Sequence, residues 1–200
     1  MKVLVIGGTG TIGGAVVRLL AAEHEVVPVA HSSGEVRVDI ASPDSIREMF
    51  RQVGRVDAVV SAAGTGAFKP LEQLSDEDFR FSLGHKLMGQ VNLVRLGLEH
   101  VADRGSITLT SGVLAREPMP GSAAISLVNA GLEGFARAAA LEAPRNIRVN
   151  VVSPPWVAET LQAMGMDPSG GLPADTVALA YHEAVTGNCT GEVLDARRFT

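Results

Sequence analysis

The fold of this chain is decided near its start, by "KVLVIGGTGTIGG" at residues 2–14. The apolar run at 2–6 is typical of a buried strand, and the glycines after it allow a tight turn into a helix. That helix carries Ile12, Val16 and Leu20 on one apolar stripe. Because backbone N–H groups at a glycine-rich helix N-terminus can face a pyrophosphate, the stretch predicts a nucleotide-binding unit. Any tight strand-to-helix turn can use glycine, which is the alternative interpretation.

The rest of the chain repeats this alternation of strand-like and helix-like segments. Further strands are expected at 25–30, 36–40, 56–64, 106–112, 147–155 and 191–196, and further helices at 42–54, 75–98, 121–135 and 173–185. Strands that alternate with helices predict a three-layer α/β fold of the Rossmann type, with a doubly wound parallel sheet covered on both faces. A chain of 200 residues suits a single domain, 1–200.

One connection is too short for this pattern. Only residues 31–35 separate the second and third strands, whereas a parallel crossover usually takes a dozen or more residues and includes a helix. We therefore expect the strand at 36–40 to be short and at the sheet edge, with no helix beside it. The alternative is that one of the two strands lies outside the sheet.

Composition narrows the classes of function. The net charge is -5, from 17 basic and 22 acidic residues without a Lys/Arg cluster, which argues against a nucleic-acid partner. The first apolar run is too short to span a membrane, so no membrane association is expected. Cys189 is the only cysteine, so no internal disulfide and no metal site are expected, and a reducing cytoplasm fits.

Six stretches along the chain together resemble a known family. They are "GGTGTIG" at 7–13, "VDI" at 38–40, "SAAG" at 61–64, "TLTSG" at 108–112, "IRVNVVSPPWV" at 147–157 and "TGEVL" at 190–194. Their order resembles that of the short-chain dehydrogenases/reductases and covers nearly the whole chain. The resemblance implies a nicotinamide dinucleotide across the carboxyl ends of the strands, a small-molecule carbonyl or alcohol substrate, and a homodimer or homotetramer.

The resemblance also implies a set of cofactor-binding residues. In the glycine turn these are Gly7, Gly10, Ile12 and Gly13, to which Thr9 and Thr11 can add hydroxyl donors. Around the adenosine they are Asp39, Ile40, Ala62, Ala63 and Gly64. In the nicotinamide half they are Asn129, Pro154 and Val157.

The end of the second strand bears on which dinucleotide binds. An acidic residue there would bind the ribose 2'-hydroxyl of NAD and repel a 2'-phosphate. The sequence has His31, Ser32 and Ser33 instead, with no carboxylate before Glu35. These side chains can donate to a phosphate, so NADP(H) is preferred, while NAD(H) is possible because the usual arginine is absent too. The alternative interpretation of this stretch is a polar turn.

The chain departs from the family in its catalytic residues. The family reaction uses Ser, Tyr and Lys, with an Asn on the preceding long helix. Alignment places Ser111 on the Ser, but Ile125 on the Tyr and Asn129 on the Lys. Both main proton-handling groups are therefore missing. The only tyrosine, Tyr181, lies in a segment whose family counterpart is a packing helix, so we expect a structural role for it.

Lys86 is a candidate replacement. It aligns with the family Asn, and on a helical wheel it points with the apolar stripe of Phe79 and Leu83, while His85 falls on the outer side. A lysine in such a stripe is costly unless it finds partners, and burial lowers its pKa toward that of a useful proton donor. Ser111 and Lys86 are thus the predicted catalytic residues. The alternative is that Lys86 extends past the stripe into solvent.

The substrate side also departs from the family. Pro155 replaces a glycine, Thr160 comes one residue late, and the segment before the last helix is short. The pocket is therefore expected to be open, or completed by Trp156, Met164 and Met166. Ordinary apolar packing is the alternative role of these three side chains.

Two functions of different classes remain. The first is an NADP(H)-dependent oxidoreductase of the short-chain type that acts on a carbonyl or alcohol through Ser111 and Lys86. The second is a catalytically silent dinucleotide-binding regulator or subunit. The glycine turn supports both, and a proton donor beside the substrate separates them.

Overall fold

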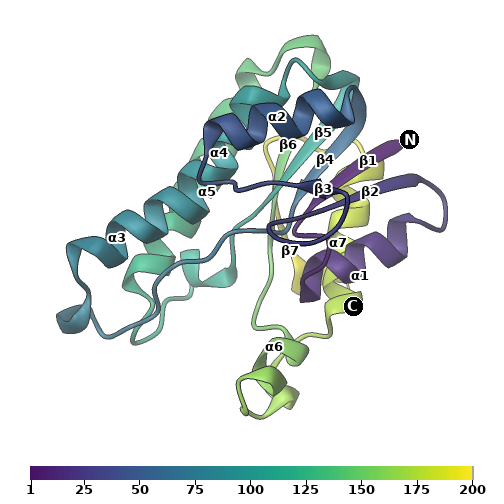
Figure 1. The fold of residues 1–200 in the computed structure, drawn as a ribbon. Helices are drawn as coiled ribbons and strands as arrows, with labels where there is room; N and C mark the ends of the chain where they lie inside the picture. The colour runs from purple at the N-terminus through teal and green to yellow at the C-terminus, as the bar shows by residue number, and fades with distance from the viewer. Residues whose placement is uncertain (200) are drawn as a thin grey trace.

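The computed structural model describes residues 1–199. Within them, one parallel sheet has the strand order β3-β2-β1-β4-β5-β6-β7 (Figure 1). The strands are β1 (Lys2–Ile6), β2 (Glu25–Ala30), β3 (Val36–Arg37), β4 (Val56–Ser61), β5 (Val101–Thr110), β6 (Arg148–Ser153) and β7 (Val193–Asp195). The order reverses between β1 and β4, as in a doubly wound sheet.

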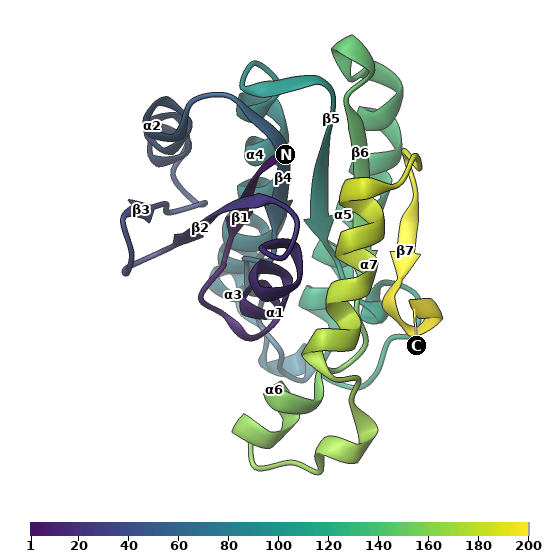
Figure 2. The same ribbon diagram turned by 90° about the vertical axis from the view of Figure 1, so that its right-hand side faces the viewer.

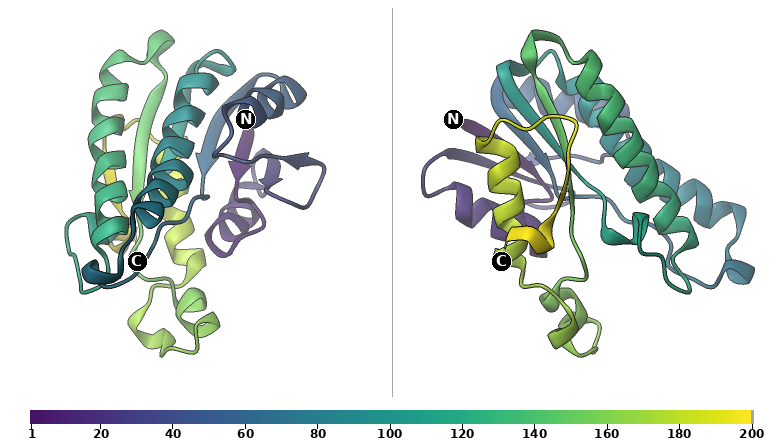
Figure 3. Two further views of the ribbon diagram at one scale, coloured as in Figure 1. Left: turned by 60° about the vertical axis from the view of Figure 1, so that its left-hand side comes forward. Right: turned by 180° about the vertical axis from the view of Figure 1, so that it is seen from behind.

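Helices cover both faces of the sheet (Figures 2 and 3). The α-helices are α1 (Thr11–Leu20), α2 (Pro43–Val53), α3 (Asp76–Ser82), α4 (Gly89–Gly97), α5 (Ala123–Glu142), α6 (Ala158–Ala163) and α7 (Ala174–Thr186). Short 3-10 turns are η1 (Leu71–Gln73), η3 (Val113–Ala115), η4 (Pro144–Asn146), η5 (Pro168–Gly170) and η6 (Ala196–Phe199), and η2 (Leu83–Met88) is a π-helix. No helix among residues 1–199 combines the length and apolar character needed to cross a bilayer.

The core is aliphatic and lies in two layers, one on each side of the sheet. On one face α2, α4 and α5 bury residues such as Phe50, Leu93 and Leu132. On the other, α1 and α7 bury Val16 and Tyr181 among others. Because a parallel strand packs against helices on both faces, its residues are apolar in continuous runs. The predicted three-layer Rossmann-type α/β fold is confirmed.

The short connection between β2 and β3 has the predicted consequence. β3 contains only Val36 and Arg37, lies at the sheet edge and pairs only with β2. No helix lies between the two strands. The strand was expected to reach residue 40, but after Val38 N–H bonds to Ala30 O at 2.9 Å the chain turns toward α2, and Asp39 Oδ1 accepts from Ala41 N.

The expected helix at 75–98 begins as predicted but does not run unbroken. Its N-terminus is a capping box in which Ser75 Oγ accepts from Asp78 N and Asp78 Oδ2 accepts from Ser75 N. The π-helical turn η2 then separates α3 from α4. Such turns insert a residue into the helix and change which side chains share a face. Lys86 lies within this turn.

Candidate functional site

A groove runs along the carboxyl ends of the strands and consists of two cavities. One has a volume of about 390 Å³ and lies by the ends of β1, β2 and β3, and the other, of about 500 Å³, lies by the ends of β5 and β6. Residues 62–65, which follow β4, line both cavities. The groove therefore crosses the place where the strand order reverses, where ligands of doubly wound folds bind.

The glycine turn forms the floor at the start of α1. Gly7 has φ +81°, and a Cβ there would lie 2.7 Å from Ala62 O. A Cβ on Gly13 would lie 2.0 Å from Gly7 O, so Gly13 packs beneath the turn rather than lining the cavity. The N-cap of α1, Gly10, supplies no side-chain acceptor to the first helical amides. These free N–H groups and the close backbone approach fit a pyrophosphate.

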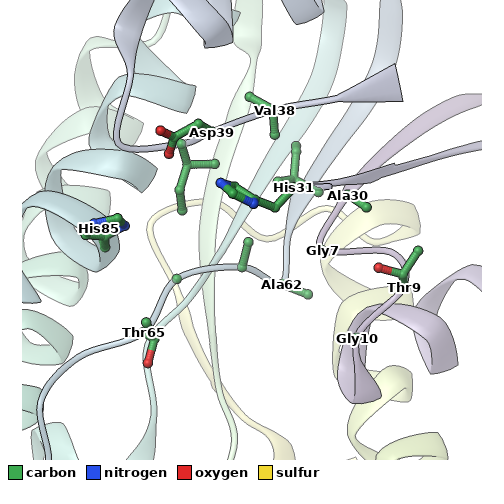
Figure 4. Close-up of a pocket in the computed structure, with 14 residues that line it drawn as sticks. Gly7, Thr9, Gly10, Ala30, His31, Val38, Asp39, Ala62, Thr65 and His85 are labelled. Carbon is green, nitrogen blue, oxygen red and sulfur yellow. The ribbon is translucent and has the colours of Figure 1, made fainter. Parts of the chain in front are cut away.

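The smaller cavity, here the adenosine-side cavity, contains most of the residues predicted to bind that half of a dinucleotide. Its lining consists of Ile6, Gly7, Thr9, Gly10, Ala30, His31, Val38, Asp39, Ile40, Ala62, Ala63, Gly64, Thr65 and His85 (Figure 4). Ser32 and Ser33 are exposed in the turn after β2 and do not line it, and neither does Thr11. Of the predicted phosphate donors after β2, His31 is the one at the cavity.

The position of His85 corrects the helical-wheel prediction. His85 was expected on the outer side of the helix, but it lines the adenosine-side cavity. The centroids of the His85 and Phe81 rings are 4.5 Å apart. The wheel assumed a regular α-helix, whereas η2 is π-helical. Consequently two neighbours in the sequence face the groove together, His85 in one cavity and Lys86 in the other.

The larger cavity, here the nicotinamide-side cavity, brings together the predicted catalytic residues. Its polar lining includes Lys86, Thr110, Ser111, Asn129 and Thr160. Ile12, Phe68, Val113, Leu114, Ile125, Pro154, Pro155, Trp156, Val157 and Met164 supply most of the apolar lining. Ile125 thus faces the cavity from α5, where the family carries its Tyr. Within the described chain, no group of three or more His, Cys, Asp or Glu side chains is arranged to hold a metal.

Lys86 is buried, with 7% of its surface exposed. No carboxylate of residues 1–199 lies within 4.0 Å of its ammonium group. Because burial disfavours the charged form and no counter-ion restores it, the pKa of Lys86 is lowered from 10.5 to about 8. The side chain therefore does not extend into solvent, and near neutral pH it is a protonated amine able to release its proton.

Asn129 lies one helical turn after Ile125 on α5 and is also buried. Its Oδ1 has no hydrogen-bond partner among the described residues. A Cβ on Gly112 would lie 3.0 Å from Asn129 Nδ2, so glycine at position 112 leaves room for that amide. An unpaired buried oxygen is costly, and a ribose hydroxyl would satisfy it. The residues of the groove therefore fit a nicotinamide dinucleotide.

Ser111 follows directly after β5, and its Oγ lies 3.3 Å from Glu133 Oε1, to which it donates. Glu133 is buried on α5, and its Oε2 also accepts from Arg116 at 3.0 Å and from Arg137 at 3.4 Å. The network ties the end of β5 to α5. The bond from Ser111 is long and hence weak.

The mouth of the nicotinamide-side cavity is apolar. The rings of Phe68 and Trp156 meet edge to face with their centroids 5.9 Å apart, and Met164 lines the cavity after α6. Met166 does not line it and is half exposed, which corrects its predicted place. The reason is that α6 ends at Ala163 and Gly165, with φ +72°, turns the chain away.

Tyr181 lies in the core on α7, as the sequence predicted. It is fully buried, does not line the cavity, and its hydroxyl lies 2.6 Å from Thr110 Oγ1. Burial raises the pKa of this hydroxyl, so it does not ionise near neutral pH. Tyr181 is a structural residue beneath the end of β5.

Three residues near the groove were not identified from the sequence: His85, Gln90 and Glu133. Gln90 is fully buried and bonds to Thr110, and Glu133 bonds to Ser111. For Glu133 a signal existed, because one acid within the otherwise apolar "AGLEGF" needs a partner if it is buried. For Gln90 the spacing of four residues from Lys86 was the available signal.

A glycine turn before an uncapped helix N-terminus, at the reversal of strand order, defines a dinucleotide-binding protein of the Rossmann type. The sequence model of a family described as enoyl-(acyl carrier protein) reductase matches residues 12–187. A hydroxynaphthalene reductase of Aspergillus fumigatus is 33% identical over 143 residues, which cover 68% of this chain and 52% of that protein.

Solved structures agree over the full length. The protein lin1944 from Listeria innocua is 42% identical with a TM-score of 0.93, and the match covers 98% of both chains. A small-chain dehydrogenase solved in complex with NADPH is 27% identical with a TM-score of 0.86, covering 98% of this chain and 95% of that one. The chain belongs to the short-chain dehydrogenase/reductase family, whose members are nicotinamide-dependent oxidoreductases.

Proposed function

We propose that this protein is an NADP(H)-dependent oxidoreductase that interconverts a carbonyl and an alcohol with Lys86 as its proton donor. The observation that carries the proposal is the buried Lys86 side chain, which has no ion-pair partner among residues 1–199 and lines the same cavity as Ser111 and Asn129. Its pKa of about 8 suits a general acid near neutral pH. Family membership supports oxidoreductase chemistry, and the cavity supports the assignment of residues.

The roles of the residues follow from their positions. A bound nicotinamide dinucleotide supplies or accepts a hydride. In the reductive direction the Lys86 ammonium donates a proton to the substrate oxygen, and in the oxidative direction the neutral amine accepts it. The Ser111 hydroxyl can exchange its weak bond to Glu133 for one to the substrate carbonyl. Asn129 Oδ1 would accept from a hydroxyl of the nicotinamide ribose, and the N–H of Val157 would donate to the carboxamide.

The preference for NADP(H) rests on the end of β2. His31 lines the adenosine-side cavity, and Ser32 and Ser33 are exposed beside it, so a 2'-phosphate meets donors there. Asp39 lines the same cavity, but it follows β3 and belongs to the proposed adenine contact. A related small-chain dehydrogenase was solved with NADPH, which supports the same cofactor here. Gly7, Gly10 and the first amides of α1 would hold the pyrophosphate.

The first experiment separates an enzyme from a silent binder. NADPH fluorescence measures binding, and NADPH oxidation is followed with a panel of aryl and alkyl aldehydes and ketones. Wild type is expected to bind and to turn over at least one carbonyl. Lys86→Met should lose about 100-fold or more in kcat, the usual range for a lost general acid, with little change in NADPH affinity.

Lys69→Met is the matched control, because Lys69 is an exposed lysine paired with Asp78 at 2.7 Å. It should leave both binding and turnover unchanged. Tight NADPH binding without turnover of any carbonyl would favour a dinucleotide-binding regulator. Turnover that survives in Lys86→Met would remove Lys86 from the mechanism.

Self-association and cellular location are further parts of the proposal. Leu127, Ala130, Gly134 and Leu141 form an exposed stripe along α5, with 89% of the Leu141 surface exposed. Such a stripe favours a homodimer or homotetramer, which light scattering after size-exclusion chromatography can measure. The lone Cys189 favours a reducing compartment such as the cytoplasm.

A further inference from the structure

Strands β4 and β5 separate at the groove. Their pairing ends at Val60 and Thr108, and after β4 the chain follows β1 instead, with Ala62 N–H donating to Ile6 O at 2.8 Å. On the other side of β5, Ser111 N–H bonds to Val152 O of β6 at 2.9 Å. Because successive residues of a strand direct their backbone groups to opposite sides, the N–H and C=O of Thr110 face the gap left by β4.

Gln90 fills this gap with its side chain. Its Oε1 accepts from Thr110 N at 2.8 Å, and its Nε2 donates to Thr110 O at 2.9 Å. The carboxamide thus replaces the peptide group that a neighbouring strand would supply. Gln90 is fully buried, so any residue without both a donor and an acceptor would leave two buried backbone groups unpaired.

The same side chain reaches the segment that carries Lys86. Gln90 Nε2 lies 3.4 Å from Lys86 O, a weak second contact, and Gln90 comes one turn after Lys86, at the start of α4. Thr110, its other partner, lines the nicotinamide-side cavity together with Lys86 and Ser111. One buried carboxamide therefore joins the two segments that carry the proposed catalytic pair.

We propose that Gln90 is a positioning residue that fixes the π-helical turn bearing Lys86 against the end of β5 bearing Ser111. This inference rests on the proposed function in one respect, namely that Lys86 is the proton donor. Its structural part, that Gln90 holds Lys86 in position, does not depend on the protein having enzymatic activity.

The pKa of Lys86 is a measure of how firmly Gln90 holds Lys86 in its buried position. Among the side chains that line its cavity, Lys86 is the one ionisable near neutral pH. The titratable side chains around the site on the packed elements are Glu133 of α5, which bonds to Ser111, and His85 of η2, which lines the other cavity. Loss of the two Gln90 bonds to Thr110 would admit water beside Lys86 and leave the Thr110 carbonyl free to accept a hydrogen bond. Both changes favour the ammonium form of Lys86 and so raise its pKa.

The test uses the small number of lysines in the chain, Lys2, Lys69 and Lys86. Protein labelled with ¹³C at the lysine Cε is titrated without cofactor, and Lys86→Met identifies the Lys86 signal. In wild type this signal should titrate near the value of about 8. In Gln90→Met its midpoint should rise by about one pH unit or more, toward the ordinary lysine value. An unchanged midpoint would overturn the proposal.

Asn92→Leu is the control, because Asn92 is another buried amide on α4, and among residues 1–199 its side chain bonds only to Arg95, outside the cavity. It should leave the Lys86 midpoint where it is. If Gln90→Met does not fold, the wild-type protein still tests the proposal. In the same pH titration, the NMR signals of the Gln90 side-chain amide should shift with the midpoint at which Lys86 titrates. Amide signals that do not change with pH would contradict the proposal.

Kinetics separate this inference from the proposed function. With a carbonyl that wild type reduces, Gln90→Met should lower kcat about tenfold or more with little change in KM, because only the placement of the donor is altered. A raised midpoint in a protein without turnover would support the positioning role while the proposed function fails. Turnover in wild type with an unchanged midpoint and kcat in Gln90→Met would remove the positioning role alone.

Discussion

The two halves of the groove are built in different ways. On the adenosine side, the turn proposed to hold the pyrophosphate is formed by backbone, with Gly7 and Gly10 at the turn and the chain after β4 beside them. The nicotinamide side is formed mainly by side chains, among them Ile125 and Asn129, which align with the family's proton-handling groups. Under the proposed function, the comparison teaches that binding through backbone can be retained while the chemistry is carried by other side chains. The following predictions test each half separately.

The largest effect on cofactor affinity is expected on the adenosine side, from Gly7→Ala. A Cβ at Gly7 would lie 2.7 Å from Ala62 O in a backbone with φ +81°. The turn must then shift away from the pyrophosphate position, so the affinity for NADPH should fall about 100-fold or more, which corresponds to about 2.7 kcal/mol. NADPH fluorescence titration measures the loss.

Gly34→Ala is a closely matched control. Gly34 has the same φ of +81°, but a Cβ there would meet nothing within 4 Å. This variant carries the backbone strain, a cost of about 1 kcal/mol in stability, without the clash. Equal losses of NADPH affinity in the two variants would mean that strain alone, not close approach at the turn, determines binding.

The next effect concerns the nicotinamide side and the pH dependence of stability. The pKa of Lys86 is near 10.5 unfolded and about 8 folded. The unfolded chain therefore binds more protons between these values, and stability rises with pH through this window. Below about pH 8 the full penalty is present, about 3 kcal/mol at 1.36 kcal/mol per pKa unit.

Lys86→Met removes this titration. Urea unfolding should show the variant to be more stable than wild type at pH 7, with the difference shrinking as the pH approaches 10.5. Lys69→Met serves as the reference for an exposed lysine. A constant difference across this range would mean that Lys86 has an ordinary pKa in the folded protein.

A smaller effect is expected at His31, where the adenosine side discriminates between cofactors. His31→Asp places a carboxylate at the end of β2, so the 2'-phosphate of NADPH is repelled and the 2'-hydroxyl of NADH gains an acceptor. The ratio of the two affinities should move about tenfold toward NADH, or about 1.4 kcal/mol. Parallel fluorescence titrations measure it, and an unchanged ratio would show that His31 does not contact the 2' position.

Much of the fold could be predicted because it depends on local patterns. The apolar run before Gly7, the capping box at Ser75 and the short connection at 31–35 each have one simple physical consequence, and each appears in the structure. The break at η2 could not be predicted, because a π-helical turn depends on the packing of the whole element rather than on any one residue.

The candidate site was likewise predictable only where it depends on local sequence patterns. Lys86 and Ser111 line one cavity, as predicted. This was predictable because the strand before Ser111 and the helical segment of Lys86 place both residues at the carboxyl edge of the sheet. The helical wheel put His85 outside because it assumed 100° per residue through η2. Gln90 and Glu133 escaped notice because their roles depend on partners distant in sequence, Thr110 and Ser111.

The central claim is that Lys86 donates the proton that the missing tyrosine would otherwise supply. The most direct measurement is the pH dependence of single-turnover NADPH oxidation with a carbonyl that the protein reduces. Because the ammonium form is the acid, the rate should be constant below the Lys86 pKa of about 8 and fall about tenfold per pH unit above it. Lys86→Met should be slow and lack this break. A wild-type rate that stays constant from pH 7 to about pH 9.5, or a break that persists in Lys86→Met, would contradict the account.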